Sequence, residues 1–458
     1  MSDPAHQLAA NLWASIGGAA SAVDALTVSG EGDLPSGFAV TDFACATIGV
    51  AGIAVAELIA SAGHPMPAVD VDRRRASFWF GTSLKPIGWE VPPVWDPIAG
   101  DYHTRDGWIR LHTNAPHHRR AAELVLGAQP DRAAMAKSVA SWAKHDLESA
   151  IVESGGCAAE MRTIAEWASH DQGRQVNAEP LVHLTSTDRN GKAGWAPEAA
   201  KPLAGVRVLD LTRVLAGPVA TRFLAGFGAD VLRIDPPGWD EAGIAPEVTL
   251  GKRCAGLDLR HPSDRDVFES LLARADIVVH GYRPGALEVL GLGTDQRRAI
   301  RPGLIDVCLD AYGWSGPWAS RRGFDSLVQM SSGIAAEGMR LADADKPMPL
   351  PVQALDQGTG YLIAATVVRA LSNRIAQGTG TLGRLSLART AKFLIDAGTT
   401  HTPRAMQSLN DNDLAKEIEQ TDWGAADRVL PPLVIQGATM RWDRAANRLR
   451  SAEAVWTA

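Results

Sequence analysis

The residue of this sequence best placed for chemistry is Asp356, which stands directly before a long apolar helical pattern that runs to Ile375. An aspartate at such a position often accepts hydrogen bonds from the free N–H groups of the first helical turn, as an N-cap. The same helix terminus also favours an ionised carboxylate that faces a ligand, and such a group can attack an acyl carbon. The residues alone leave both interpretations open.

Other catalytic and metal-binding patterns are absent from the sequence. The segment Gly313–Gly316 does not form a G-x-S-x-G elbow, and neither H-E-x-x-H nor a P-loop occurs. Three neighbouring histidines lack cysteine or carboxylate ligands nearby, so they are predicted to form a surface cluster: His112, His117 and His118. The four cysteines include no C-x-x-C pair. The sequence therefore predicts no metal site and no permanently bound cofactor.

Composition excludes several classes of partner. The formal net charge of −7 and the pI near 6.0 give no basic footprint for nucleic acid or an anionic membrane surface. The N-terminus lacks a basic region followed by an apolar one. Residues 42–62 are strongly apolar but contain Asp42 and Glu57, so we expect a buried helix and not a membrane span. These features predict a cytoplasmic protein.

The elements that must position Asp356 begin with a strand–helix–strand pattern at Val206–Asp235. A short apolar strand is followed by the turn Leu215–Pro218, an amphipathic helix, and a second strand that ends before two prolines. Such a unit starts a doubly wound parallel sheet, whose ligands bind at the carboxyl ends of the strands. The Ala-Gly-Pro turn is not G-x-G-x-x-G, which argues against a dinucleotide even though Asp235 stands where a ribose-binding acid would.

Four regions are predicted along the chain. Residues 1–84 form a helix and strand segment, residues 85–200 a small α+β domain, residues 201–396 a Rossmann-like domain, and residues 397–458 a segment that packs on the large domain. Residues 85–100 read as a linker, 101–113 as a β-hairpin, and the polar stretch 184–202 as the clearest boundary.

An internal repeat relates the two ends of the chain. Asp42 and Asp356 each precede a long apolar helix, a glycine, a strand and a second helix, and the offset between them is 356 − 42 = 314 residues. We interpret this as a duplication. The run Arg73–Arg75, which opens the second helix of the first copy, is predicted to be a solvated face.

The second copy resembles the family III coenzyme A transferases, the CaiB/BaiF family. The resemblance rests on motifs that occur in order between residues 203 and 396: the Ala216-Gly217-Pro218 turn, Gly251-Lys252-Arg253, Tyr282-Arg283-Pro284-Gly285, Arg301-Pro302-Gly303, Gly323-Phe324-Asp325, Asp356, and Gly378 to Leu387. The fold that it implies is α/β, a doubly wound Rossmann-like parallel sheet domain with a smaller α+β domain.

The resemblance also implies an activity, the transfer of coenzyme A from an acyl-CoA to a carboxylic acid acceptor. Asp356 matches the family's catalytic aspartate, which would form a covalent intermediate with the acyl group and then with CoA. The residues expected to bind the CoA thioester are Val214, Leu215, Ala216, Gly217, Lys252, Arg253, Gly281, Tyr282 and Arg283. Among them, Lys252, Arg253 and Arg283 are the candidates for binding the CoA phosphates. Gly281 and Leu215 depart from the family pattern, which expects Asn at the first position and in some members Gln at the second.

The first 200 residues resemble the same family in a different order, as a later part of one copy placed before an earlier part of another. Family members usually form interlocked dimers. This arrangement would combine the needed pieces in one chain and leaves a homodimer open. We expect Asp42 to cap its helix without catalytic work, that helix to pack on the Asp356 helix, and the 101–113 hairpin to close over the CoA site.

Two alternatives to transfer remain at this stage. One is an acyl-CoA racemase or epimerase, since relatives use this fold for α-proton exchange. Phe324 argues against it, because it stands where racemase relatives carry a histidine and it cannot move a proton. The other alternative is a non-catalytic CoA-binding paralogue, which the departures at Leu215, Gly281 and the single glycine of Ile98–Gly100 permit.

Overall fold

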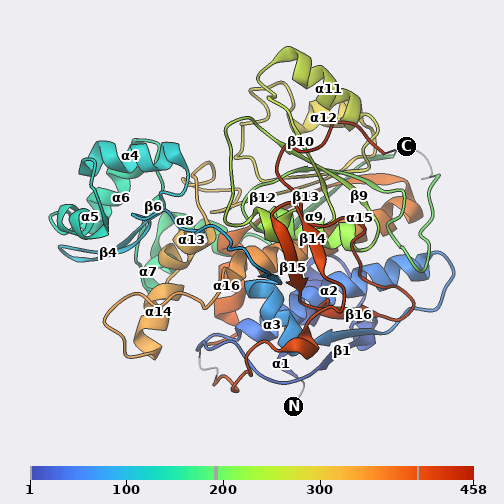
Figure 1. Cartoon of the computed structure of the whole chain (residues 1–458), viewed down its shortest axis with the longest axis horizontal. Helices are drawn as coiled ribbons and strands as arrows, with labels where there is room; N and C mark the ends of the chain where they lie inside the picture. Colours follow the sequence, from blue (N-terminus) through green and yellow to red (C-terminus); the bar gives the residue numbers. More distant parts are fainter. Residues whose placement is uncertain (1–2, 190–193, 400–401, 458) are drawn as a thin grey trace.

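The structure, a computed structural model, describes residues 3–189, 194–399 and 402–457. Its centre is a seven-stranded sheet with the order β10-β9-β8-β11-β12-β13-β7 (Figure 1). The strands are β7 (His183–Arg189), β8 (Arg207–Leu211), β9 (Asp230–Asp235), β10 (Arg253–Gly256), β11 (Ile277–His280), β12 (Ile305–Asp310) and β13 (Thr379–Ser386). Strands β8 to β13 run parallel to one another, and β7 pairs with β13 in the antiparallel direction.

This sheet confirms the predicted doubly wound architecture. In chain order, β8 to β13 follow the 3-2-1-4-5-6 arrangement of dinucleotide-binding sheets, so the winding direction reverses between β8 and β11. All four residues of β11 are buried, as a parallel strand covered on both faces requires. The apolar runs that predicted strands therefore reflect burial on two sides, and the reversal point predicts where a ligand binds.

The helices occur along most of the described chain. They are α1 (Pro4–Ser15), η1 (Ala20–Ala25), α2 (Val40–Ser61), α3 (Arg73–Gly81), α4 (Pro116–Leu126), α5 (Arg132–Val139), α6 (Lys144–Glu153), α7 (Ile164–Ser169), α8 (Asp171–Ala178), α9 (Ala216–Gly226), α10 (Ala245–Val248), α11 (Pro262–Leu272), α12 (Thr294–Ile300), α13 (Asp325–Ser331), α14 (Ile334–Leu341), α15 (Ala354–Gln377), α16 (Leu387–Asp396) and η2 (Asp411–Asp413).

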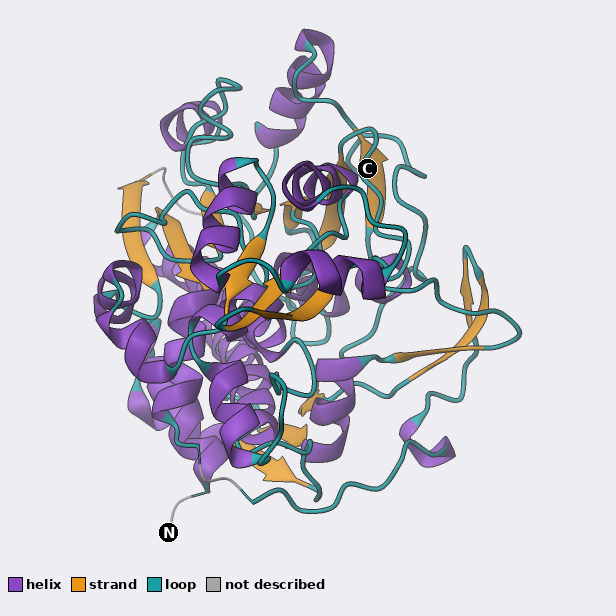
Figure 2. Cartoon of the chain, turned by 90° about the vertical axis from the view of Figure 1, so that its left-hand side faces the viewer, coloured by secondary structure: helices purple, strands orange, loops and turns teal. Residues whose placement is uncertain are grey.

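Three small sheets surround the large one. The remaining strands are β1 (Leu26–Ser29), β2 (Val69–Asp72), β3 (Leu84–Pro86), β4 (Gly100–Thr104), β5 (Gly107–Leu111), β6 (Ala158–Glu160), β14 (Glu419–Thr421), β15 (Gly424–Arg428) and β16 (Leu433–Ile435). They pair as β1-β2-β16, β14-β15-β3 and β4-β5-β6. The last sheet and helices α4 to α6 form a small unit, which lies on the left of Figure 1 and faces the viewer in Figure 2.

The regions are more interwoven than the sequence predicts. Both ends of the chain share two sheets, because β16 pairs with β2 and β15 pairs with β3. The stretch 184–202 contains most of β7, which completes the large sheet, so the boundary predicted there is wrong for its first part; residues 190–193 lie outside the described part. Short strands with distant partners carry little local signal, and this explains both differences.

The two long apolar helices pack together, as the repeat predicts. Helix α15 lies between α2 and α9 (Figure 1). A Cβ on Gly358 would lie 2.2 Å from the Phe43 ring of α2, and one on Gly360 would lie 2.5 Å from the Ala216 carbonyl oxygen of α9. The copies keep the predicted order, α2–β2–α3 and α15–β13–α16. Two glycines thus hold α15 close to its neighbours on both sides.

Helix α2 is a core element. Among the described residues it is the one helix long and apolar enough to cross a membrane, but 89% of its most apolar window is buried inside the protein. Its burial confirms the predicted buried helix.

Asp42, Arg73 and Arg74 of the first copy do not have the surroundings that the sequence predicts. Asp42 is the third residue of α2 and not its N-cap, because the helix begins at Val40. The Asp42 carboxylate accepts a hydrogen bond from Arg73 Nη1 at 2.7 Å, and Arg73 also binds Asp33. Arg73 is buried and Arg74 is bonded to Asp413, so a solvated arginine face is wrong for these two residues. Their acidic partners, Asp33, Asp42 and Asp413, come from other segments of the chain, which local sequence cannot reveal.

Candidate active site

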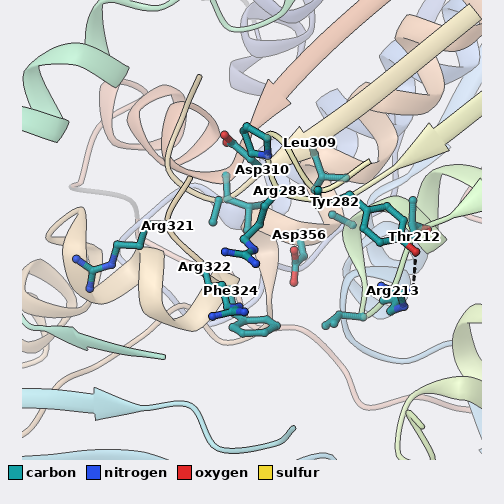
Figure 3. A pocket seen from close by; sticks show the side chains of 18 of the residues that line it. Thr212, Arg213, Tyr282, Arg283, Leu309, Asp310, Arg321, Arg322, Phe324 and Asp356 are labelled. Carbon is teal, nitrogen blue, oxygen red and sulfur yellow. Dashed lines mark hydrogen bonds between the residues drawn. The ribbon is translucent and has the colours of Figure 1, made fainter. Parts of the chain in front are cut away.

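A cavity of about 430 Å³ opens at the reversal point of the large sheet. The segments that follow β8, β11 and β12 line it, together with the start of α9, the loop before α13 and the first turn of α15 (Figure 3). Because the carboxyl ends of parallel strands meet at one edge, side chains from segments far apart in sequence converge here. The cavity therefore lies where the doubly wound pattern predicts a ligand.

Asp356 stands within this cavity. It is the third residue of α15, whose N-cap position is Gln353, so the N-cap interpretation of Asp356 is wrong. Asp356 is only 7% exposed, yet it lines the cavity and points between several arginine side chains (Figure 3). A carboxylate that is free of capping bonds and directed into a cavity can act on a ligand.

A second aspartate holds the backbone of Asp356. Asp325 Oδ2 accepts the Asp356 N–H at 2.8 Å, while its Oδ1 accepts a hydrogen bond from Gln329 Nε2 at 2.5 Å. Gln329 Oε1 in turn accepts the Leu350 N–H at 2.7 Å. Asp325 is therefore a positioning residue. Sequence reasoning used it only as part of a motif, because no local pattern indicates that it reaches the start of a helix 31 residues later.

Burial governs the protonation of this pair. Burial and the neighbouring charge of Asp325 raise the pKa of Asp356 well above its usual range. Burial also raises the pKa of Asp325 to about 6, although hydrogen bonds from Gln329 and the backbone oppose that increase. Both carboxyls therefore hold protons to higher pH than free aspartates, and a site that needs Asp356 ionised works better as the pH rises.

The turn before α9 brings its backbone to the cavity. Val214 has a left-handed φ of 64°, which is costly for a β-branched residue, and its N–H donates to Glu241 Oε1 at 2.6 Å. Val214 and Ala216 line the cavity. Leu215 and Gly217 do not, but a Cβ on Gly217 would lie 2.3 Å from the Thr212 side chain. Leu215 and Gly217 therefore belong to the turn itself and do not face the cavity.

Three residues after β11 lie where the sequence predicts. Gly281, Tyr282 and Arg283 all line the cavity. The Tyr282 hydroxyl accepts a hydrogen bond from Arg213 Nη2 at 2.8 Å, and the Arg213 guanidinium lies over the Trp239 and Tyr282 rings. Sequence reasoning missed Arg213 and Trp239, although each stands two residues after a strand or its proline stop and could have been found by that position.

The predicted roles of Lys252 and Arg253 in phosphate binding need correction. Lys252 is 0% exposed, and its Nζ donates to Asp210 Oδ2 and to the Pro218 carbonyl oxygen, both at 2.9 Å. Arg253 pairs with Asp230 at 3.0 Å. Neither residue lines the cavity. Their motif braces β8, β9 and α9 from within, because a buried lysine is stable only with an acid and acceptors around it.

The small unit closes the cavity through helix α4. His117 and His118, in its first turn, line the cavity opposite the large sheet. His112 stacks on Phe324 with ring centroids 3.8 Å apart, and His118 meets the same ring edge-on at 5.8 Å. His112 is 5% and His118 is 3% exposed, so the predicted surface cluster is wrong for both. The hairpin β4–β5 was expected to close over this site, but its residues do not line the cavity.

A second cavity of about 560 Å³ adjoins the first. The two share Val214, Trp239, His117 and Phe324 as lining residues. The outer wall comes from the segment 93–97 and from the loop 238–244, which carry proline, tryptophan and aliphatic side chains. The linker predicted between domains therefore contributes a wall to the site region.

Part of this chain is similar to known proteins. The model of CoA-transferase family III matches residues 203–427. A probable fatty acyl-CoA transferase of Mycobacterium tuberculosis is 37% identical over 193 residues, covering 39% of this chain and 48% of the relative. The succinyl-CoA:glutarate CoA-transferase of Mus musculus is 32% identical over 250 residues, covering 51% of this chain and 54% of the relative.

Among solved structures, a CaiB/BaiF family protein from Brucella suis is 25% identical, with a TM-score of 0.40 over 49% of this chain and 65% of that chain. The chain spans about half the length of the curated relatives it matches. The matched range contains the turn before α9, the segment after β11 and Asp356. Residues 203–427 of this chain thus match the model of CoA-transferase family III, and relatives named as CoA transferases are similar over parts of the chain.

Proposed function

We propose that this protein transfers coenzyme A from an acyl-CoA to a free carboxylic acid, with Asp356 as the nucleophile. One observation carries the proposal: the Asp356 carboxylate faces a cavity at the reversal point of the sheet, and no side chain of the described residues binds its oxygens. The match of residues 203–427 to the model of CoA-transferase family III supports the same activity. The acyl group and the acceptor acid are open.

The proposed reaction is a series of acyl transfers through Asp356, and each transfer forms one bond to an acyl carbon as it breaks another. The Asp356 carboxylate attacks the thioester carbon, and the CoA thiolate leaves a mixed anhydride behind. The thiolate then attacks the Asp356 carbonyl, which releases the donor acid and forms an aspartyl-CoA thioester. The acceptor carboxylate attacks this thioester and gives a new anhydride, from which the thiolate takes the acceptor acyl group and restores Asp356. No step consumes water or a proton.

The surroundings suit such transfers. Walls from the small unit and the large sheet enclose Asp356, and exclusion of water protects the anhydride from hydrolysis. The N–H groups at the start of α9, next to Ala216, are proposed donors to the oxyanion that develops in each attack. Arg213 and Tyr282, with the Trp239 ring, line the same cavity and offer a cation and flat surfaces to the part of acyl-CoA near its thioester.

A covalent adduct provides the direct test. The protein is incubated with a panel of acyl-CoAs and analysed by intact mass spectrometry and peptide mapping. We expect a CoA or acyl adduct on Asp356 in the wild type and none in Asp356→Asn. An adduct on another residue, or transfer at wild-type rates by folded Asp356→Asn, would reject Asp356 as the nucleophile.

A further inference from the structure

Two arginines near Asp356 lack an acidic partner. Within the described ranges, neither Arg283 nor Arg322 forms an ion pair, and the one side-chain hydrogen bond of Arg322 goes from Nη1 to the Gly155 carbonyl oxygen at 3.1 Å. Both side chains line the cavity that also holds Asp356 (Figure 3), and the charge of Arg322 acts on Arg283. Two neighbouring guanidinium groups repel each other unless an anion lies between them.

Arg321, the neighbour of Arg322, shows the contrast. Its guanidinium pairs with Glu148 at 3.0 Å, donates to the Ala158 carbonyl oxygen, and lies 3.8 Å from the centre of the Trp318 ring. Arg321 is therefore committed to holding the small unit against the loop before α13. In the described structure, Arg283 and Arg322 have no ion pair of this kind.

A buried histidine completes the cluster. His118 is 3% exposed, and in the described structure neither Nδ1 nor Nε2 has a hydrogen-bond partner. A buried polar group without a partner costs about 1–3 kcal/mol, so native proteins rarely keep one unless a ligand or water completes it. His118 lines the same cavity as the two arginines. The His118 ring is thus a buried hydrogen-bond donor without a partner in the described structure.

Electrostatics agree with a missing anion. Burial and the charge of Arg322 lower the pKa of Arg283. Burial, together with the charges of His117, Arg322 and Arg283, lowers the pKa of His118 to about 3. His118 is therefore neutral at physiological pH and carries one N–H to donate. An anion between these groups would relieve the repulsion and satisfy that donor.

We propose that Arg283, Arg322 and His118 form the binding site for the carboxylate of the acid co-substrate, beside the nucleophile. This inference rests on the proposed function, because it names how the acid is recognised. It also changes the predicted role of Arg283, from a CoA phosphate ligand to a carboxylate ligand. Planar guanidinium groups suit a carboxylate because they can donate two parallel hydrogen bonds.

The position of the cluster favours a carboxylate over a phosphate of CoA. The whole pantetheine arm separates the phosphates of CoA from its sulfur. An acyl-CoA whose thioester reaches Asp356 must therefore place its phosphates outside the 430 Å³ cavity that holds both Asp356 and the cluster. The acid, in contrast, must bring its carboxylate to Asp356 itself. The cations would also offset the repulsion between that carboxylate and the aspartate pair.

The test measures binding, so it does not depend on turnover. Wild type, Arg322→Gln and His118→Asn are titrated with acetate and separately with CoA, and histidine ring ¹⁵N NMR signals report the acetate binding. Matched controls remove the same group from exposed positions that line no cavity described above, Arg274→Gln and His64→Asn. Loss of one charge-assisted hydrogen bond should weaken acetate binding about tenfold or more in both site variants. Binding of CoA should stay within about twofold.

Each result has a distinct meaning. Weaker acetate binding with unchanged CoA binding, together with a shift of the wild-type His118 ring signals on adding acetate, supports the carboxylate site. Weaker CoA binding with unchanged acetate binding would assign the cluster to phosphate and overturn the inference, as would a wild type that binds no acetate. Failure of the wild type to form any adduct on Asp356 would instead count against the proposed function, whether or not the protein binds acetate. Arg322→Gln, on an incompletely buried residue, keeps the test valid if His118→Asn folds poorly.

Discussion

The Asp325 carboxylate accepts the backbone N–H of Asp356 at 2.8 Å, so one aspartate occupies the helix terminus that would otherwise attract the other. The first turn of α15 is thereby satisfied without using the Asp356 side chain. Because that side chain need not cap its own helix, it can face the cavity. The two carboxyls are separated by 31 residues in sequence and share one electrostatic environment.

Removing the charge of Asp325 should change the pH dependence of transfer. Activity requires ionised Asp356, so it falls as the pH drops through the raised pKa of that residue. In Asp325→Asn one of the two causes of that raised pKa is lost, and we expect the acid limb of the kcat/KM profile to move to lower pH. An unchanged acid limb in a folded variant would show that Asp325 does not control the ionisation of Asp356.

Asp356→Asn should abolish CoA transfer and leave the fold intact. The residue is not an N-cap, so its amide variant loses no capping bond, and relief of a buried carboxyl repulsion should keep the melting temperature at or above that of the wild type. The measurements are acyl-CoA turnover and thermal unfolding. Turnover within a few-fold of wild type would disprove the assignment.

Asp42→Asn is the matched control from the other copy, and the structure predicts the opposite result. Arg73 binds both Asp42 and Asp33 in a buried network, and breaking such a network costs about 3 kcal/mol or more. We expect a clear fall in melting temperature with turnover per folded molecule unchanged. A selective loss of turnover would place chemistry in both copies.

Alanine substitutions at Gly358 and Gly360 of α15 should both lower stability, but only the one at Gly360 should also lower kcat. A Cβ at Gly360 meets the Ala216 backbone beside the cavity, whereas one at Gly358 meets the Phe43 ring on the opposite side. Each alanine variant should lose about 1–3 kcal/mol through overpacking. Gly360→Ala should also lower kcat, because it moves Asp356 relative to the α9 turn. Equal kcat in the two folded variants would contradict this account.

Asp310 should make stability depend on pH. Burial raises the pKa of this carboxyl to about 8, above the value of 3.8 expected in the unfolded chain. Between about pH 4 and 8 the folded state thus holds a proton that the unfolded state releases, so this contribution to stability is lost as the pH rises. In thermal unfolding across that pH window, the melting temperature of Asp310→Asn should rise relative to that of the wild type as the pH increases. Parallel curves would reject the raised pKa.

We expect no α-proton exchange on a 2-methylacyl-CoA. Phe324 replaces the histidine that racemase relatives use, and its ring stacks on His112. Deuterium incorporation is measured on wild type and on His118→Asn, because His118 lies against the edge of the same ring. Exchange at an enzymatic rate would overturn the expectation, and its loss in the variant would identify His118 as the base.

The sequence by itself determined much of this protein. Apolar runs, turn residues and motif order predicted the parallel sheet and the duplicated helix–strand–helix units, while the role of Asp356 stays a prediction from the family resemblance. These features are local, because periodicity and capping preferences act over a few residues. The predicted packing of α2 on α15 also followed from the apolar, small-residue composition of both helices.

Only the tertiary structure decided which charged groups face the cavity. Lys252 and Arg283 are both basic residues in family-like motifs, yet one is buried on Asp210 and the other lines the site. Likewise His118 was expected at the surface and is buried against Phe324. The free energy of a charge or an imidazole depends on desolvation and on partners brought together by chain segments distant in sequence, and no local pattern encodes those partners.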